Sequence, residues 1–389
     1  MKLIATFLLV ICFILSFSQS QYPNREIRIV KLSGRGYNLG LEHGKLLKKE
    51  IGEIVLRMKK NTADNLHQDA DQVIREFNVY ARFDETIKKY TPELFEEVKG
   101  IADGSGQALG DIMVLNLIDE FWVYNDMRDH HHCSGMGVPS MGGNAAYIAQ
   151  NLDIESYTEG YQILLRLARS GKSPEQLILT HPGCIAMNGL NETGIGTCVN
   201  TLMDLKASST GLPVAFIVRR IINSVDKNDL LEFIQTVPHA SGQNYIIGIH
   251  AEVFDFEASA NKVIRFNPNH ANGSVYHTNH AIANDDIKPW YKLLDANQHM
   301  NANTMIRLNA VKKRIATASS IDDILIKETL RSKDDKNNPV CRTFDVKHGG
   351  FTFGSVIMTL TGKPFIQITA GSPDASEYKK IDFTDHLDN

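Results

Sequence analysis

The sequence predicts an α+β fold in which helices and strands occupy separate layers. Helical spacing of apolar residues dominates the chain up to residue 132, whereas short strand patterns dominate from residue 133 onward. Strands in runs, with helices grouped apart from them, are typical of layered α+β domains. The chain has 389 residues, 43% of them hydrophobic, which is enough to bury a large core. We expect one compact unit, with a domain boundary at residue 133 as the alternative.

The part before residue 133 is expected to be mainly helical. Residues 26–32 alternate apolar and polar side chains and predict a strand. Several glycines follow, and apolar residues then recur at helical spacing from about Leu46 to Phe77. A further helix is expected from Pro92 to Ala102, with Thr91 as its N-cap and Pro92 in its first turn.

The part after residue 133 is expected to be mainly strands. Asn191–Gly194 and Thr361–Pro364 have the composition of turns between strands. Two helical stretches interrupt the strands, at about Pro213–Ser224 and Met300–Ala318. The expected strands cover residues 145–150, 163–168, 176–180, 194–202, 245–250, 252–257, 263–266 and 355–361.

The N-terminus has the composition of a secretory signal. A basic start, Met1-Lys2, precedes an apolar run at residues 3–17, and small residues follow at its end. The run is shorter than the ~20 residues that a membrane-spanning helix needs. We therefore expect a signal peptide at residues 1–18 and no stable membrane insertion after its removal. The expected location is secreted or periplasmic, or a lysosome-like compartment in a eukaryote.

The net charge bears on possible binding partners, and the cysteines bear on possible disulfide bonds. The net charge is −4, and no basic excess favours a nucleic-acid partner. Four cysteines remain beyond the signal, and in an oxidising compartment some of them could pair. Cys184 and Cys198 flank a turn and are one candidate pair.

Cys133 is the first residue with candidate chemistry. It follows Asp129-His130-His131-His132 and has three interpretations: a buried structural cysteine, a metal ligand, or a nucleophile. Adjacent histidines on a strand point to opposite faces, which disfavours a shared metal ion. A thiolate is a good nucleophile when a base or positive charge lowers its pKa. His132 is such a base by adjacency, although neighbouring side chains seldom face each other.

Two polar clusters follow Cys133. Asn151-Leu152-Asp153 closes the expected strand at residues 145–150, where the aspartate either orients a protonated amine or caps a turn. In His277-Thr278-Asn279-His280, the Asn279 amide could donate to a developing oxyanion. His277 and His280 could instead bind zinc, although no glutamate completes an HExxH pattern. From these residues alone, an enzyme is only weakly indicated.

In their order, these segments resemble the acyl-coenzyme A:isopenicillin N (6-aminopenicillanic acid) acyltransferase family of N-terminal-nucleophile hydrolases. Choloylglycine hydrolases and acid ceramidase are more distant relatives. Each matching segment is weak alone, but their order and the Cys133 to Asp153 interval make the set specific. The segments are Gly36–Gly40 with His43-Gly44, Glu97–Ala102 with Gly104 and Gly106, Cys133-Ser134, Gln150–Asp153, Asn191–Gly194, Gly211–Pro213 with Arg219, Glu257, and His277–His280.

The resemblance implies a four-layer αββα fold and self-cleavage between His132 and Cys133. Residues 19–132 would form a propeptide or α chain and residues 133–389 the catalytic β chain, and the two would remain associated. By resemblance, the new α-amine of Cys133 acts as base for its own thiol, since such amines have a pKa near 8. Asp153 would hold that amine, and Asn279 would bind the oxyanion. Asn151, Arg219, His277 and His280 are expected to support the site or substrate, with no cofactor and no metal.

Two departures from the family pattern stand out. The residue before Cys133 is His132, where the penicillin enzyme has glycine, so the scissile bond must be held in place by its surroundings. The family also has an arginine just before the late strand, where this chain has His348-Gly349-Gly350. Arg342 is the candidate replacement.

The expected function is therefore an exported hydrolase of a linear, non-peptide amide bond in a small molecule, acting through an acyl-thioester at Cys133. One alternative is acyl transfer to an amine acceptor. A second is a relative that keeps the fold without the chemistry. The third is a zinc-dependent hydrolase that uses His130, His132, His277 or His280.

Overall fold

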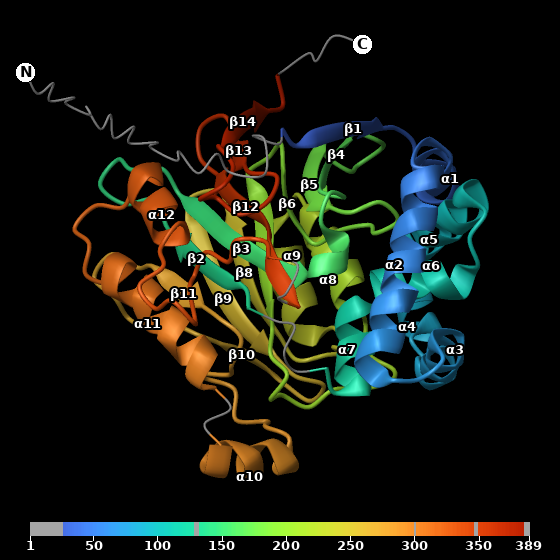
Figure 1. Ribbon diagram of the computed structural model, residues 1–389. Helices are drawn as coiled ribbons and strands as arrows, with labels where there is room; N and C mark the ends of the chain where they lie inside the picture. The colour runs from blue at the N-terminus through green and yellow to red at the C-terminus, as the bar shows by residue number, and fades with distance from the viewer. Residues whose placement is uncertain (1–25, 128–131, 299–300, 346–348, 385–389) are drawn as a thin grey trace, which may run out of the picture.

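The computed structural model describes residues 26–127, 132–298, 301–345 and 349–384 (Figure 1). The expected signal peptide, His130, His131 and His348 lie outside these ranges. Two β-sheets stack face to face at the centre, with helices on both sides. In the described ranges no helix has both the length and the apolar character needed to cross a membrane.

The larger sheet has eight strands, and all neighbours pair antiparallel except the parallel pair β1 and β4. The strand β1 comes before residue 133, yet it belongs to the same sheet as strands that come after residue 133. In spatial order the strands are β1 (Arg28–Leu32), β4 (Ile163–Leu167), β5 (Gln176–Thr180), β6 (Asn188–Asn191), β7 (Ile195–Thr201), β8 (Gln243–Ile249), β9 (Glu252–Ala258) and β10 (Val263–Arg265).

The smaller sheet has six antiparallel strands and carries the candidate nucleophile beside its second strand. In spatial order they are β11 (Val275–His277), β2 (Ser134–Val138), β3 (Tyr147–Glu155), β12 (Gly350–Thr359), β13 (Phe365–Ile368) and β14 (Lys379–Asp382). Two helices cover its outer face, α11 (Ala302–Ile315) against β2 and β11, and α12 (Asp323–Leu330) against β3 and β12.

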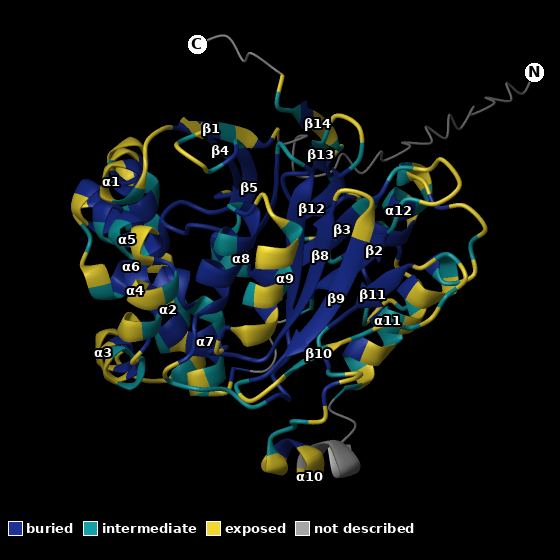
Figure 2. Ribbon diagram, turned by 180° about the vertical axis from the view of Figure 1, so that it is seen from behind, coloured by how far each residue is buried: buried dark blue, intermediate teal, exposed yellow. Residues whose placement is uncertain are grey.

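The outer face of the larger sheet is covered by α8 (Val214–Ile222), which packs on β6 and β7, and is followed by α9 (Lys227–Thr236). Figure 2 shows the strands as the most deeply buried part of the molecule, with helices on either side. This arrangement is the expected four-layer αββα sandwich. The helix α10 (Pro289–Gln298) projects from one end (Figure 1).

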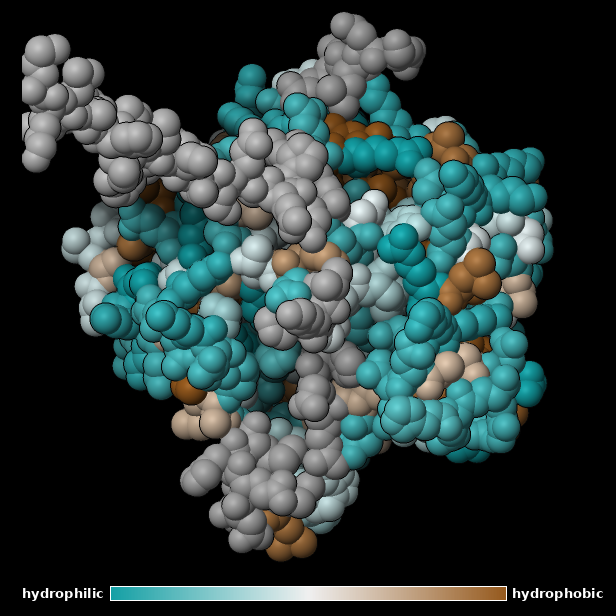
Figure 3. All heavy atoms as spheres, viewed as in Figure 1, coloured by the Kyte–Doolittle hydropathy of each residue, from teal (hydrophilic) through white to brown (hydrophobic). Residues whose placement is uncertain are grey.

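The helices described before the nucleophile gather at one side of the sandwich (Figure 1). They are α1 (Gly36–Leu46), α2 (Lys48–Leu66), α3 (Ala70–Tyr80), α4 (Asp84–Tyr90), α5 (Pro92–Ser105), α6 (Leu109–Asn116) and α7 (Ile118–Asn125). The face in Figure 3 is mainly hydrophilic over these helices, with apolar side chains scattered among the polar ones.

Glycines let α1 and α5 cross at backbone contact. A Cβ on Gly40 would lie 1.8 Å from the carbonyl oxygen of Glu97, and a Cβ on Gly100 would lie 2.1 Å from that of Tyr37. Real Cβ atoms do not approach so closely, so only glycine fits at both positions. The glycine spacing that resembles the family therefore serves helix packing.

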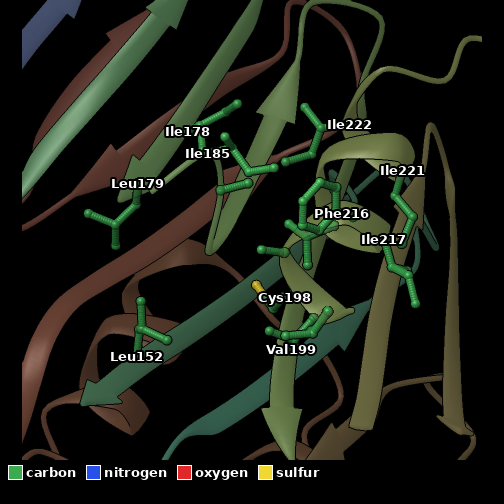
Figure 4. Close-up of a cluster of buried hydrophobic side chains, with 14 of the residues drawn as sticks. Leu152, Ile178, Leu179, Ile185, Cys198, Val199, Phe216, Ile217, Ile221 and Ile222 are labelled. Atoms are coloured by element: carbon green, nitrogen blue, oxygen red, sulfur yellow. The ribbon is translucent and has the colours of Figure 1, made fainter. Parts of the chain in front are cut away.

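The inner faces of the two sheets and α8 form the main core. Figure 4 shows a cluster of buried side chains from this core, among them Leu152 of β3, Cys198 of β7, and Phe216 and Ile217 of α8. In β2, glycine again permits close approach, since a Cβ on Gly137 would lie 2.3 Å from Val253 Cγ1. The end of β2 farther from Cys133 therefore packs closely on β9 of the larger sheet.

Several expected elements are confirmed, and others need correction. The strand near residue 26, the helix beginning at Pro92 and the two turns occur as expected. The single helical pattern at residues 46–77 is instead divided among α1, α2 and α3. Thr91 makes no capping hydrogen bond, because its hydroxyl donates to the Ile87 carbonyl. Cys184 and Cys198 are both free and buried, so the candidate disulfide is absent.

Candidate active site

Cys133 lies immediately before β2 and is 5% exposed. Its Sγ contacts the main-chain oxygen of Asp153 at 3.6 Å. Burial and the Asp153 carboxylate raise the pKa of this thiol to about 12, so it is neutral in the uncut chain. A base placed next to the sulfur is therefore needed before Cys133 can attack a carbonyl.

A narrow, mostly apolar cavity adjoins Cys133. The volume of this cavity is about 40 Å³, which has room for roughly three water molecules. Its polar lining includes Asp119, Asp153 and Thr201. The apolar walls come from both halves of the chain and include Leu115, Ile118, Trp122, Leu152, Ile154, Val199, Val214, Ala215 and Val218. The lining is that of an apolar binding site, and in the uncut chain its volume admits only a short acyl group next to the sulfur.

Asp153 lies within β3, which continues to Glu155, and does not close the strand as expected from the sequence. Both carboxylate oxygens are buried and accept no hydrogen bond from the described residues, although Thr352 lies opposite on β12. Burial raises the pKa of Asp153 to about 7, while Arg342, Thr352 and Arg307 act to lower it. A buried carboxylate without a donor is costly unless a cation or a proton arrives.

Asn279 lies in the loop after β11, with its amide engaged on both sides. Its Nδ2 donates to the Thr201 carbonyl at 3.1 Å, and its Oδ1 accepts from Arg307 Nη2 at 3.0 Å. Thr201 lines the cavity that contains Cys133. Asn279 itself is not among the lining residues, but its amide nitrogen is directed toward one of them, the side on which an oxyanion donor is needed.

His277 and His280 hold the loop that carries Asn279. His277 Nε2 lies 2.8 Å from Glu257 Oε1, and burial opposes its charge, but Glu257 and Asp255 raise its pKa to about 9. Glu257 also accepts backbone N–H bonds from the loop at residues 282–284. His280 Nδ1 contacts the Thr304 hydroxyl at 3.0 Å, and burial lowers its pKa to about 4.

The zinc interpretation finds no support in this geometry. His277 and His280 face different partners, and His132 Nδ1 contacts Asn303 Oδ1 at 3.0 Å. Within the ranges that the structure describes, no three His, Cys, Asp or Glu side chains converge as metal ligands. His130 lies outside those ranges. His132 also makes no contact with the Cys133 thiol that would mark it as the base.

Asn151 and Arg219 are placed as structural supports. Asn151 Nδ2 donates to the carbonyls of Leu330 and Val340, at 2.8 and 2.9 Å, and so ties β3 to the α12 region. Arg219 of α8 is 3% exposed and pairs with Glu97 of α5 at 3.0 Å. Neither side chain is among the residues that line the Cys133 cavity.

Arg342 precedes β12 in the chain and lies beside the start of that strand, where its carbonyl accepts from the Thr352 N–H at 2.9 Å. Its Nη1 is 3.3 Å from the point where a Cβ on Gly350 would stand. This nitrogen is buried and donates to no acceptor in the part of the chain that the structure describes. Its charge acts on Asp153. The expectation that Arg342 takes over the arginine's role fits this placement and stays a prediction.

Arg307 is the site residue that sequence reasoning missed. It lies in the middle of α11, is 1% exposed, and donates to the carbonyl oxygens of His132 and Cys133. One indication was present in the sequence. Helical spacing places Arg307 on the same face as Thr304, Val311 and Ile315, all of which are buried.

The profile of the family "Acyl-coenzyme A:6-aminopenicillanic acid acyl-transferase" matches residues 140–374. This match covers Asp153, Asn279, Arg307 and Arg342, but begins after Cys133. One similar protein is the "Acyl-coenzyme A:6-aminopenicillanic-acid-acyltransferase 40 kDa form" of Emericella nidulans. It is 25% identical over 259 residues, which are 66% of this chain and 70% of that protein.

A second similar protein is "Protein dcd1A" of Dictyostelium discoideum, 36% identical over 113 residues, which are 25% of this chain and 26% of that protein. Among solved structures, a Caenorhabditis elegans N-acylethanolamine-hydrolyzing acid amidase ortholog aligns with a TM-score of 0.40 and 16% identity, over 58% of this chain and 92% of that chain. A mutant of the conjugated bile acid hydrolase from Clostridium perfringens aligns with a TM-score of 0.41 and 14% identity, over 64% of this chain and 92% of that chain.

The family profile covers more than half of the sequence, and the four-layer sandwich is the fold expected from the family resemblance. The chain belongs to the acyl-coenzyme A:6-aminopenicillanic acid acyl-transferase family.

Proposed function

We propose that this protein is a cysteine N-terminal-nucleophile hydrolase that cuts a linear amide bond in a small molecule. It would first cleave itself between His132 and Cys133. The observation that carries the proposal is the pairing of Cys133 with Asp153. A neutral thiol lies beside a buried carboxylate that accepts no hydrogen bond from the described residues. Arg342 and Arg307 act on this carboxylate from a distance, and the ammonium that self-cleavage creates at Cys133 would add a cation next to it.

The α-amine of Cys133 would take the thiol proton as Sγ attacks the carbonyl carbon of the amide. Negative charge then develops on the substrate oxygen, where Asn279 Nδ2 is the proposed donor. The carbon–nitrogen bond breaks, the leaving amine takes the proton, and the acyl group stays on Sγ as a thioester. Water attacks that thioester and releases the carboxylic acid, which restores the thiol.

The cavity supports an apolar acyl group over a charged one. Its walls are mainly Leu, Ile, Val, Ala and Trp side chains beside the sulfur. The amine side of the substrate would face away from this cavity. The substrate class is therefore an N-acyl amine with an apolar acyl part. No cofactor enters these steps, and the two chains would remain associated after the cut.

The test is turnover of a panel of N-acyl amines that vary in acyl length, measured as release of the free amine. Acid quenching during turnover should trap the chain that begins at Cys133 with the mass of one acyl group added. The matched control is Cys133→Ala, which should release no amine and gain no mass. Normal amine release by Cys133→Ala would contradict the mechanism.

Acyl transfer is the second candidate, favoured by the similarity to the Emericella nidulans acyltransferase. The same thioester would then be taken by an amine acceptor instead of water. Adding a primary amine during turnover separates the two outcomes. A new amide formed at the expense of the free acid indicates transfer, whereas unchanged acid release indicates hydrolysis.

Export belongs to the same proposal and rests on the composition of residues 1–18. The first residue of the protein recovered from the culture medium or periplasm tests it. A chain that starts after residue 18 supports export, and retention of Met1 inside the cell contradicts it.

A further inference from the structure

Arg307 makes a set of contacts around the peptide bond that is expected to be cut. Its Nη1 donates to the carbonyl oxygen of His132 at 2.7 Å and to that of Cys133 at 2.6 Å. The same nitrogen lies 3.0 Å from Ser134 Oγ. One guanidinium group thus spans the last residue before the cut and the first two residues after it.

This guanidinium group is a buried cation without a counter-ion at contact distance. Arg307 is 1% exposed, its hydrogen bonds in the described ranges all go to uncharged oxygens, and the Asp153 carboxylate acts on it only from beyond contact distance. Burial lowers its pKa to about 10, so it stays charged at neutral pH. Its acceptors are carbonyl, amide and hydroxyl oxygens. Burying a charge in this way costs free energy, and a group that gains negative charge nearby would offset that cost.

The side chain of His132 is held by the same turn of α11. Asn303 Oδ1 accepts from Arg307 Nε at 2.9 Å and lies 3.0 Å from His132 Nδ1. Asn303 Nδ2 in turn donates to Asn338 Oδ1 at 2.6 Å. Both the carbonyl and the imidazole of His132 are therefore fixed from one helix. This supplies the hold on the scissile bond that a residue bulkier than glycine requires.

We propose, resting on the function proposed above, that Arg307 is a catalytic residue of self-cleavage and afterwards a positioning residue for Asn279. In the first role, Cys133 Sγ attacks the carbonyl carbon of His132, and negative charge develops on the oxygen that Arg307 Nη1 contacts. The bond from that carbon to the Cys133 nitrogen breaks, and the nitrogen takes the thiol proton. Water then hydrolyses the thioester, which frees the thiol and leaves a carboxylate on His132.

The second role follows from hydrogen-bond polarity. A guanidinium group carries only donors, so the side of the Asn279 amide that faces Arg307 must be its oxygen. The amide nitrogen is thereby directed toward Thr201 at the cavity. Without Arg307 the amide keeps only its hydrogen bond to the Thr201 carbonyl, so the donor that the oxyanion needs is held by one anchor instead of two.

The experiment measures the fraction of cut chain against time after synthesis, by intact mass under denaturing conditions, in Arg307→Met and Arg307→Lys. Arg314 lies on the same helix, is paired with Asp334 and reaches none of these groups, so Arg314→Met and Arg314→Lys are matched controls. Loss of one oxyanion donor costs about 100-fold or more in rate. We expect that loss in Arg307→Met, a smaller one in Arg307→Lys, and wild-type rates in both controls.

Circular dichroism reports whether each variant is folded. If Arg307→Met does not fold, the cutting rate of Arg307→Lys tests the inference instead. In the cut fraction of Arg307→Lys, kcat should fall with little change in KM, because Asn279 acts on the transition state. Cutting of either folded Arg307 variant at the wild-type rate overturns the inference and leaves the proposed function intact. A wild-type chain that never cuts overturns both.

Discussion

Glu97 and Arg219 form a buried ion pair, 3.0 Å between Oε1 and Nη1, that joins the residues before Cys133 to those after it. Each side chain is 3% exposed. Arg219 also donates to the Ile185 carbonyl at 3.1 Å, beside the cavity residues Cys184 and Ala186. The helical segment and the catalytic core therefore share one buried charge pair close to the wall of the candidate site.

Breaking the Glu97–Arg219 ion pair should destabilise the packing between the two expected chains. Arg219→Met leaves Glu97 as an uncompensated buried charge, which should lower the free energy of unfolding by about 3–5 kcal/mol. The double variant Arg219→Met with Glu97→Leu should recover most of that loss, because neither charge remains. Urea denaturation followed by circular dichroism measures both. A single variant as stable as the wild type would contradict a structural role for the pair.

The α1–α5 crossing should not tolerate a methyl group. Gly40→Ala places a Cβ 1.8 Å from the Glu97 carbonyl oxygen, and overpacking of this kind costs about 1–3 kcal/mol. Gly52→Ala in α2 is the matched control, since its nearest neighbour is a flexible Gln107 side chain at 3.5 Å. There alanine should stabilise the helix by about 1 kcal/mol. Thermal melts of the two variants should therefore shift in opposite directions.

Asp153→Asn should separate stability from activity. The carboxyl is buried, and its pKa is raised to about 7, so a neutral amide of the same shape should preserve the fold. Loss of the partner for the Cys133 amine should reduce turnover by roughly 100-fold or more. Melting temperature and amine release measure the two effects. Wild-type turnover with an intact fold would remove Asp153 from the mechanism.

The His277–Glu257 pair should make the site sensitive to alkaline pH. The folded-state pKa of His277 is about 9, above its usual 6.5. The stability that this pair contributes is therefore fully present below pH 6.5 and is lost as the pH rises through about 9. Melting temperature should fall over that interval. In Glu257→Gln the melting temperature should be lower than that of the wild type at mildly acidic pH and approach the wild-type value once His277 is neutral in both.

The sequence predicted the layers of this fold better than its closest contacts. Short stretches rich in apolar residues in β8 and β9, and the turn at Gly194, are local features of the sequence, so these elements could be predicted directly. The strand β2, with the sequence Ser-Gly-Met-Gly-Val, was not expected. Its apolar and polar residues do not alternate, because both faces of the strand are buried. Its glycines leave room for the side chains of Ile246 and Val253 on the other sheet.

The residues of the candidate site also differ in how far the sequence could predict them. Cys133, Asp153 and Asn279 were identified through resemblance; the first two line one cavity, and Asn279 donates to the carbonyl of a third lining residue, Thr201. Asn151 was expected to support the site or substrate, and its amide donates to carbonyls at and beyond the end of α12. Arg307 is separated from Cys133 by 174 residues and reaches it only through the packing of α11 on β2. No local pattern encodes such a contact.

Intact mass under denaturing conditions, for the wild type beside Cys133→Ala, tests the central claim most directly. The account predicts two fragments in the wild type, one of which begins at Cys133, and one uncut chain in Cys133→Ala. A folded wild-type chain that stays uncut, or a Cys133→Ala chain that is cut at the same bond, would contradict it.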